Sequence, residues 1–123
     1  MAYRGEVISG KQLGRRLNFP TANIRLPQTR LLPDGVFAVR VTVDGKTYGG
    51  MCNIGTKPTV DNSNTRQIET HLFDFSDDLY GHTITVELLA KIRDEQKFAS
   101  VDKLVAQLAQ DKMAAMDILQ QQR

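Results

Sequence analysis

The sequence lacks most of the features that assign a chain to a specialised class of protein. It has no tryptophan, a single cysteine and no apolar stretch near the roughly 20 residues that a membrane-spanning helix needs. The segment from Met1 to Glu6 has no apolar core of the kind found in signal peptides. One cysteine, Cys52, excludes a disulfide framework, and an unpaired thiol fits a reducing compartment. We therefore expect a cytoplasmic protein that is neither secreted nor bound to a membrane.

The sequence also has little excess of positive over negative charge. The 123 residues carry 16 lysines and arginines against 14 aspartates and glutamates, a net charge of +2, and the basic residues are scattered. This balance does not by itself indicate binding to nucleic acid. The hydrophobic fraction of 41% and the charged fraction of 24% are ordinary for a globular protein. We expect one domain over residues 1–123, long enough to bury a core of its own.

Short alternating runs of apolar and polar residues predict a body made of β-strands. The runs with this period are Tyr3–Ile8, Val36–Val43, Lys46–Ile54, Ile68–Phe73 and Ile84–Ile92. Asp44-Gly45 predicts a tight hairpin between the second and third runs, and residues 58–65 predict an exposed loop. Short strands joined by glycine-containing turns, with no helix between them, favour a closed antiparallel barrel over residues 3–98.

After Phe98 the period changes to that of a helix, expected over residues 101–120. Ser100 is a suitable N-cap, and Asp102 in the first turn complements the helix dipole. An apolar stripe predicts the face that packs on the barrel; it consists of Val101, Leu104, Val105, Leu108, Ala115, Met116 and Leu119.

A candidate metal site lies in the tetrapeptide Pro20-Thr21-Ala22-Asn23. The Thr21 hydroxyl and the Asn23 amide oxygen are hard ligands of the kind that Mg2+ accepts beside nucleotide phosphates. Being two residues apart, they project to the same face of an extended segment. The alternative is a plain turn into a strand, in which both side chains bond to local backbone.

A basic, glycine-containing segment precedes this tetrapeptide. Lys11, Arg15 and Arg16 are the one local cluster of positive charge, and Arg15 is the best candidate for a phosphate contact. Gly10 and Gly14 let backbone approach a ligand closely. The pattern is not a Walker A loop, because no Gly-Lys-Ser/Thr closes it. A solvated charge cluster is the alternative.

The tetrapeptide and its Gly-Arg-x-Leu-x-Phe lead resemble the signature of the riboflavin kinases. Four further blocks fall in that family's order and at similar spacing: Asn53–Thr59, Ile68–Asp74, Leu79–Gly81 and Ile92–Phe98. Together the blocks cover nearly the whole chain, and they are most similar to the C-terminal kinase module of bacterial bifunctional riboflavin kinase/FAD synthetase. The resemblance implies a closed six-stranded antiparallel Greek-key β-barrel with a C-terminal helix packed against it.

The resemblance also implies roles for particular residues. Glu69 matches the glutamate that activates the ribityl hydroxyl, and Arg93 with Phe98 matches a block that frames the flavin. The residues implied for binding ATP or flavin further include Gly10, Lys11, Gly14, Arg15, Pro20 and Asn53, with Thr21 and Asn23 as metal ligands.

Each of these roles has a plainer alternative. Glu69 could be an exposed strand glutamate, and strand alternation places it with His71, opposite Ile68. His71 is the weaker candidate for a base, because a lone histidine in a strand is more often structural. Arg93 could form a surface ion pair with Asp94 or Glu95, worth at most ~1 kcal/mol.

The leading hypothesis is therefore transfer of the γ-phosphoryl group of ATP to the ribityl 5′-hydroxyl of riboflavin, giving FMN and ADP. Mg2+, with Mn2+ or Zn2+ as substitutes, is the expected cofactor. The alternatives are a small barrel that binds nucleic acid through its basic loop, and a flavin-binding module without catalysis. The resemblance further implies an FMN adenylyltransferase domain in a full-length protein, for which these 123 residues have no room.

Overall fold

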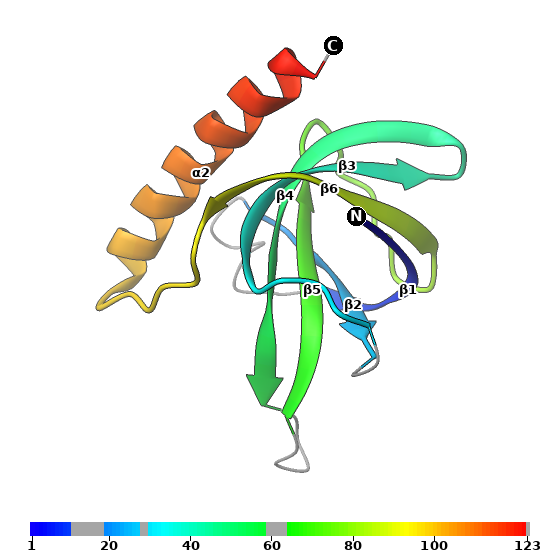
Figure 1. Cartoon of the computed structure of the whole chain (residues 1–123), viewed down its shortest axis with the longest axis horizontal. Coiled ribbons are helices and arrows are strands. Elements are labelled where there is room, and N and C mark those ends of the chain that lie inside the picture. Colours follow the sequence, from blue (N-terminus) through cyan, green and yellow to red (C-terminus); the bar gives the residue numbers. More distant parts are fainter. Residues whose placement is uncertain (11–18, 28–29, 59–63, 123) are drawn as a thin grey trace.

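The protein, seen here in a computed structural model, folds into a β-barrel with one helix against its outside (Figure 1). The structure describes residues 1–10, 19–27, 30–58 and 64–122. The strands are β1 (Ala2–Gly10), β2 (Ala22–Leu26), β3 (Gly35–Val43), β4 (Lys46–Pro58), β5 (Asn64–Leu72) and β6 (Thr83–Arg93), followed by helix α2 (Val101–Gln121).

The barrel is closed in the strand order β1-β2-β5-β4-β3-β6, and every neighbouring pair is antiparallel. The order places β5 between β2 and β4, so the chain crosses from β2 to β3 in the manner of a Greek key. The predicted six-stranded barrel with a C-terminal helix is confirmed.

The predicted hairpin turn between β3 and β4 is also confirmed. Asp44 and Gly45 both have positive φ, 49° and 80°, as the type I′ turn requires. Val43 and Lys46 pair directly on either side of it. Asparagine, aspartate and glycine adopt this left-handed backbone at least cost, which is why the dipeptide alone predicted the turn.

Two strand boundaries differ from the prediction by four residues each, the others by two or fewer, and one short strand had no predicted range. The predicted strands ended at Ile54 and began at Ile68, but pairing of β4 with β5 continues outward to Pro58 and Asn64. This outer part is a polar hairpin arm without apolar alternation, so its period carries no signal. Residues 59–63 of the predicted loop lie outside the described residues. Strand β2 is only five residues long; the sequence indicated an extended segment or a turn into a strand there, without a strand range.

Alternation along each strand separates a barrel interior from an outer face. The interior is the larger apolar cluster, whose fully buried members include Val7, Ile24, Leu26, Val39, Val41, Ile54, Ile68, Ile84 and Val86. Cys52 also lies in this cluster as a free thiol, as predicted, and burial raises its pKa.

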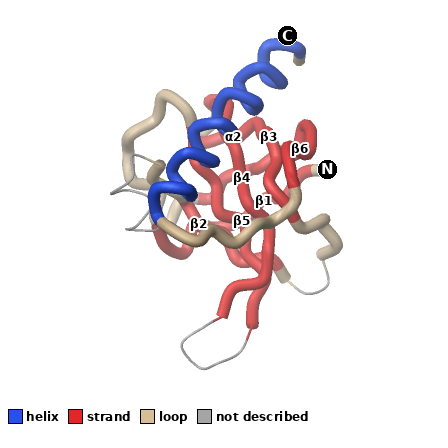
Figure 2. Tube along the Cα trace, turned by 90° about the vertical axis from the view of Figure 1, so that its left-hand side faces the viewer, coloured by secondary structure: helices blue, strands red, loops and turns tan. Residues whose placement is uncertain are grey.

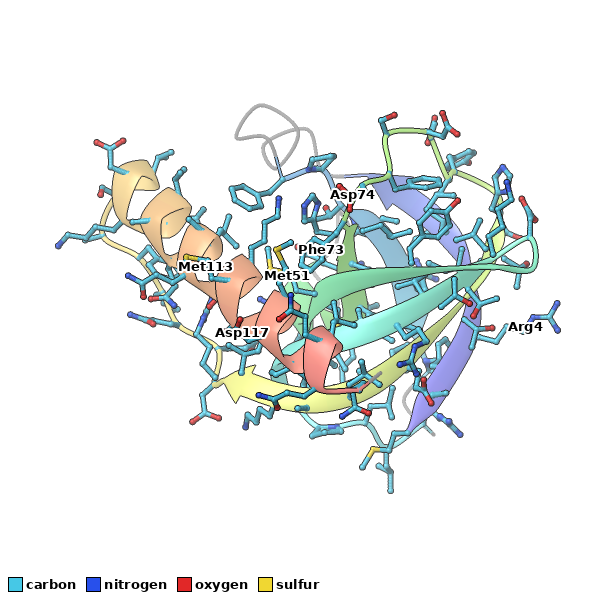
Figure 3. The ribbon with its side chains drawn as sticks, turned by 90° about the horizontal axis from the view of Figure 1, so that it is seen from above. Arg4, Met51, Phe73, Asp74, Met113 and Asp117 are labelled. Atoms are coloured by element: carbon cyan, nitrogen blue, oxygen red, sulfur yellow. The ribbon has the colours of Figure 1, made fainter. Side chains whose placement is uncertain are left out.

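A second, smaller cluster joins the outer face of the barrel to α2, which lies across β3, β4 and β6 (Figure 2). Ala38, Met51, Phe73 and Ala115 are its buried members. In Figure 3, Met51 and Phe73 lie on the side of the barrel that faces the helix. Gly49 permits the close approach, because a Cβ there would lie 2.6 Å from Leu119 Cδ1.

Helix α2 begins as predicted but packs differently along its length. The Ser100 hydroxyl accepts a hydrogen bond from the Lys103 amide at 3.2 Å, so it is the N-cap. The predicted stripe is correct for Leu108, Ala115 and Leu119. It is wrong for Val101 and Met116, which are 51% and 44% exposed. Across the part of the chain that the structure describes, no helix combines the length and apolar character needed to traverse a bilayer.

Candidate active site

Three polar side chains that the sequence singled out lie in one row across three neighbouring strands. Asn23 of β2 pairs with Glu69 of β5, and Glu69 pairs on its other side with Asn53 of β4. Directly paired residues point to the same face of a sheet, with strands about 4.8 Å apart. Ile24 and Ile68, one position along, point into the barrel, so the row lies on the outer face.

Asn23 is almost completely buried, 3% exposed, while Glu69 and Asn53 are half-buried. The Asn53 amide oxygen is buried and has no hydrogen-bond partner within the described ranges. The row therefore brings two amide groups beside one carboxylate.

Thr21 lies directly before β2, next to this row. Its hydroxyl oxygen is buried and has no hydrogen-bond partner in the described part of the chain. The segment does lead into a strand, as the plainer alternative held, but the Thr21 hydroxyl does not bond to described local backbone. A buried hydroxyl oxygen two residues before the Asn23 amide fits the oxygen chemistry that Mg2+ prefers. Histidine, cysteine and acidic residues form no metal-binding group of three or more among the described residues.

A cavity of about 420 Å³ is lined in part by Pro20, Thr21 and Ala22. Its apolar walls include Val7, Leu72 and Phe75, and Asp77 and Asp78 also line it. Thr70, which is completely buried, also lines this cavity with a hydroxyl that has no hydrogen-bond partner among the residues described. No sequence pattern predicted this cavity, because its lining comes from four separate segments.

His71 follows Glu69 by two residues on β5 and lies on the same face of the strand, as the alternation predicted; the structure shows that this is the outer face of the barrel. It is 8% exposed, and its ring lies between Phe19 and Phe73 in edge-on contacts with centroid distances of 5.4 and 5.6 Å. Its Nδ1 atom is 2.8 Å from the carbonyl oxygen of Pro20. Burial is the main cause that lowers the pKa of His71; Lys112 adds to the lowering, and the hydrogen bond to Pro20 opposes it.

Arg93 continues the same register row at its far end. Asn53 pairs with Val36 of β3, and Val36 pairs with Arg93 of β6. The carboxylate partner of Arg93 is not Asp94 or Glu95, as the plainer alternative held.

Instead Arg93 forms a bidentate ion pair with Asp111 of α2, with Nε at 3.0 Å from Oδ1 and Nη2 at 2.8 Å from Oδ2. Gln107 donates to the same carboxylate at 2.9 Å, and the guanidinium lies 5.6 Å from the centre of the Phe98 ring. Asp111 is 1% exposed and was missed by the sequence, since nothing local marks a carboxylate on the buried side of a helix.

The segment after β6 passes over the outer face close to this row. Gly55 follows Asn53 by two residues on β4, and a Cβ there would lie 2.0 Å from a Glu95 carboxylate oxygen. Asp94 pairs with Lys91, and this contact lowers the pKa of the Asp94 carboxyl. The Arg93–Phe98 segment therefore forms one wall beside the outer-face row.

The predicted phosphate-binding residues are placed only in part. Gly10, the last residue of β1, pairs with Ala22, one residue from Thr21. Lys11, Gly14 and Arg15 lie outside the described residues. Pro20 is held by His71, so the tetrapeptide and the strand that carries Glu69 are in direct contact.

Comparison with known proteins identifies the family. The family model described as Flavokinase, riboflavin kinase, matches residues 1–119. A bifunctional riboflavin kinase/FMN adenylyltransferase from Escherichia coli K12 is 47% identical over 117 residues, which cover 94% of this chain and 37% of that protein. The chain thus spans little more than a third of the length of the curated bifunctional relatives that it matches.

Solved structures agree on the fold. A riboflavin kinase from Trypanosoma brucei superposes with a TM-score of 0.68 at 29% identity, covering 97% of this chain and 79% of that one. A chain named macrolide-efflux protein from Streptococcus pneumoniae superposes with a TM-score of 0.83 at 39% identity, covering 94% and 38%. A shared fold does not by itself carry an activity.

Proposed function

The chain belongs to the riboflavin kinase family, and on this premise we propose that it transfers the γ-phosphoryl group of ATP to the 5′-hydroxyl of riboflavin, giving FMN and ADP. The observation that carries the proposal is the register row Asn23, Glu69 and Asn53, with Thr21 beside it. Phosphoryl transfer needs neutralised phosphates, an aligned hydroxyl and a group that accepts its proton. The row offers candidates for all three within neighbouring strands.

Glu69 accepts the proton of the ribityl hydroxyl in this proposal. A carboxylate can do so if the hydroxyl comes within hydrogen-bond reach. Glu69 is half-buried on the outer face, between two amide-bearing neighbours that can orient a polyol through hydrogen bonds. His71 is unsuited to the role, because its Nδ1 atom is engaged by the Pro20 carbonyl and its ring is covered on two sides.

Thr21 and Asn23 would hold the metal ion, for which we propose Mg2+, with Mn2+ or Zn2+ as substitutes. When bound, the ion neutralises charge on the phosphates of ATP. Two neutral ligands bind Mg2+ weakly, so the nucleotide itself would supply the rest of the affinity. The buried hydroxyl oxygen of Thr21 supports this assignment.

In this arrangement the nucleotide binds at the Thr21 end of the row and the flavin at the Arg93 end. The cavity of about 420 Å³ beside Thr21 has apolar walls suited to a purine base. Gly10, Lys11, Gly14 and Arg15 would then contact the phosphates. Arg93 and Phe98, at the far end of the row, would frame the isoalloxazine ring.

The direct test incubates the pure protein with riboflavin, ATP and Mg2+ and separates the flavins by chromatography. We expect FMN and ADP in equal amounts. Glu69→Gln should keep the fold and lower turnover by at least ~100-fold. Glu87→Gln is the matched control, because Glu87 is a half-exposed strand glutamate paired with Arg40. Near-normal turnover by the Glu69 variant would remove this residue from the mechanism.

We further infer a cytoplasmic location, supported by the free, buried thiol of Cys52. The bifunctional relatives support an FMN adenylyltransferase domain elsewhere in a full-length protein. The present chain, tested alone, should then stop at FMN.

A further inference from the structure

We propose that His71 is a positioning residue for phosphoryl transfer: it holds the Pro20–Thr21 peptide in place relative to Glu69. The inference rests on the proposed function and adds to it a role for a residue outside the implied metal, base and ligand set. It comes from how strand β5 contacts the segment that precedes β2.

The backbone pairing of β2 with β5 stops just short of Thr21. Ala22 and Thr70 are the last residues paired in this direction. Beyond them, the His71 side chain continues the connection, because its Nδ1 atom lies 2.8 Å from the Pro20 carbonyl oxygen. One hydrogen bond from a side chain thus replaces the next rung of the ladder.

The direction of this hydrogen bond follows from its chemistry. A carbonyl oxygen only accepts, so Nδ1 of His71 must carry the proton and donate it. Burial lowers the pKa of His71, which favours the neutral ring. The bond therefore requires the Nδ1–H tautomer, with Nε2 unprotonated.

The ring is fixed in the orientation that this bond needs. Phe19 and Phe73 contact it edge-on at interplanar angles of 63° and 69°. Phe73 belongs to the cluster beneath α2, and Lys112 of that helix lies over its outer side, 5.5 Å from the ring centre. Rotation of the imidazole would require these aromatic neighbours to move, so the donor is held in advance of ligand binding.

Thr21 is linked to this contact through the Pro20–Thr21 peptide, whose carbonyl oxygen is the one that His71 contacts. Pro20 has no N–H, so its carbonyl is the backbone group through which that residue can be held. The Thr21 hydroxyl has no hydrogen-bond partner among the described residues. The position of a metal ligand at residue 21 is therefore set by its backbone, which is held by the pairing of Ala22 on one side and by the hydrogen bond between His71 and Pro20 on the other.

The experiment compares two substitutions of similar size. His71→Asn places an amide N–H near the Nδ1 position and keeps the donor, whereas His71→Leu fills the space without one. Both variants are purified and their melting temperatures measured, and kinetics are recorded well below either midpoint.

We expect His71→Leu to lower kcat by at least ~10-fold and to raise the Mg2+ concentration for half-maximal rate severalfold, since displacement of a reacting group by about 1 Å can cost ~100-fold. The KM for riboflavin should change by less than about twofold, because the ring end of the site is untouched. His71→Asn should recover kcat to within about threefold of the original chain. Equal losses in the two variants, or unchanged kcat and Mg2+ dependence in His71→Leu, would overturn the proposal.

A second measurement does not depend on turnover. Long-range proton–nitrogen NMR of the unsubstituted protein reports which nitrogen of His71 carries the proton. The Nδ1–H tautomer is expected, and an Nε2–H tautomer would refute the hydrogen bond. Absence of FMN formation by the unsubstituted protein would instead reject the proposed function, and the two failures are thereby distinguished.

Discussion

Removal of the Asp111 carboxylate should cost the fold a large part of its stability. Asp111 is 1% exposed and its partner Arg93 has a side chain 17% exposed, so the pair is largely withdrawn from water. In Asp111→Ala the guanidinium would keep its charge and lose its carboxylate. Breaking a buried pair in this way costs about 3–5 kcal/mol, well above the ~1 kcal/mol of an exposed pair. Domains of this size are stable by only about 5–15 kcal/mol.

Three variants separate the charge from the packing. Asp111→Asn keeps the shape of the side chain but offers one acceptor oxygen to donors from both Arg93 and Gln107. Its free energy of unfolding should therefore lie between those of the original chain and Asp111→Ala. The double variant Arg93→Met with Asp111→Leu replaces the pair by apolar groups of similar size. It should be markedly more stable than Asp111→Ala, because no charge is left buried alone.

The assay is urea unfolding followed by circular dichroism, with the free energy of unfolding taken by linear extrapolation. The same series should raise the KM for riboflavin if Arg93 contacts the ring as proposed. If Asp111→Ala lowers the free energy of unfolding by less than about 1 kcal/mol, and its dependence on urea concentration is unchanged, the argument from burial is refuted.

Three further predictions concern other parts of the molecule. Gly49→Ala should destabilise the protein by about 1–3 kcal/mol, since the new Cβ would lie 2.6 Å from Leu119 Cδ1; urea unfolding measures this, and a neutral result would mean that the Leu119 side chain moves aside without cost. Because the pKa of His71 is lower in the folded protein, the unfolded chain takes up the proton first as pH falls below about 6.5. Stability should therefore fall with pH there, by at most about 1.4 kcal/mol per pH unit, and a series of unfolding curves should show a flatter slope in His71→Asn. Cys52 should resist a thiol reagent in the native state and react fully in urea, because burial raises the pKa of its thiol; rapid native labelling would contradict this.

The sequence predicted the elements whose signals are local. Alternation was sufficient to predict β3 and β6, and the Asp44-Gly45 dipeptide was sufficient to predict the turn, because side-chain period and left-handed backbone are properties of neighbouring residues. Strand β2 and the outer arm of β4 and β5 were missed or shortened, since five residues or polar residues carry no usable period.

The site was predictable as a set of residues but not as an arrangement. Motifs pointed to Asn23, Glu69 and Asn53, yet only strand register places them side by side. Asp111 follows Arg93 by 18 positions and lies on a helix, so no spacing rule connects them. The hydrogen bond from His71 to Pro20 joins residues 51 positions apart, so no sequence pattern predicts it either.

The outer-face row and the barrel interior share the same strand alignment, and this couples chemistry to foldability. A slip of β5 by a single position would turn Glu69 inward and expel Ile68 into water. No misaligned form could keep a sound core while losing the carboxylate. Chains in which β5 pairs in the wrong register should therefore be degraded as unfolded protein. They should not accumulate as folded protein without activity.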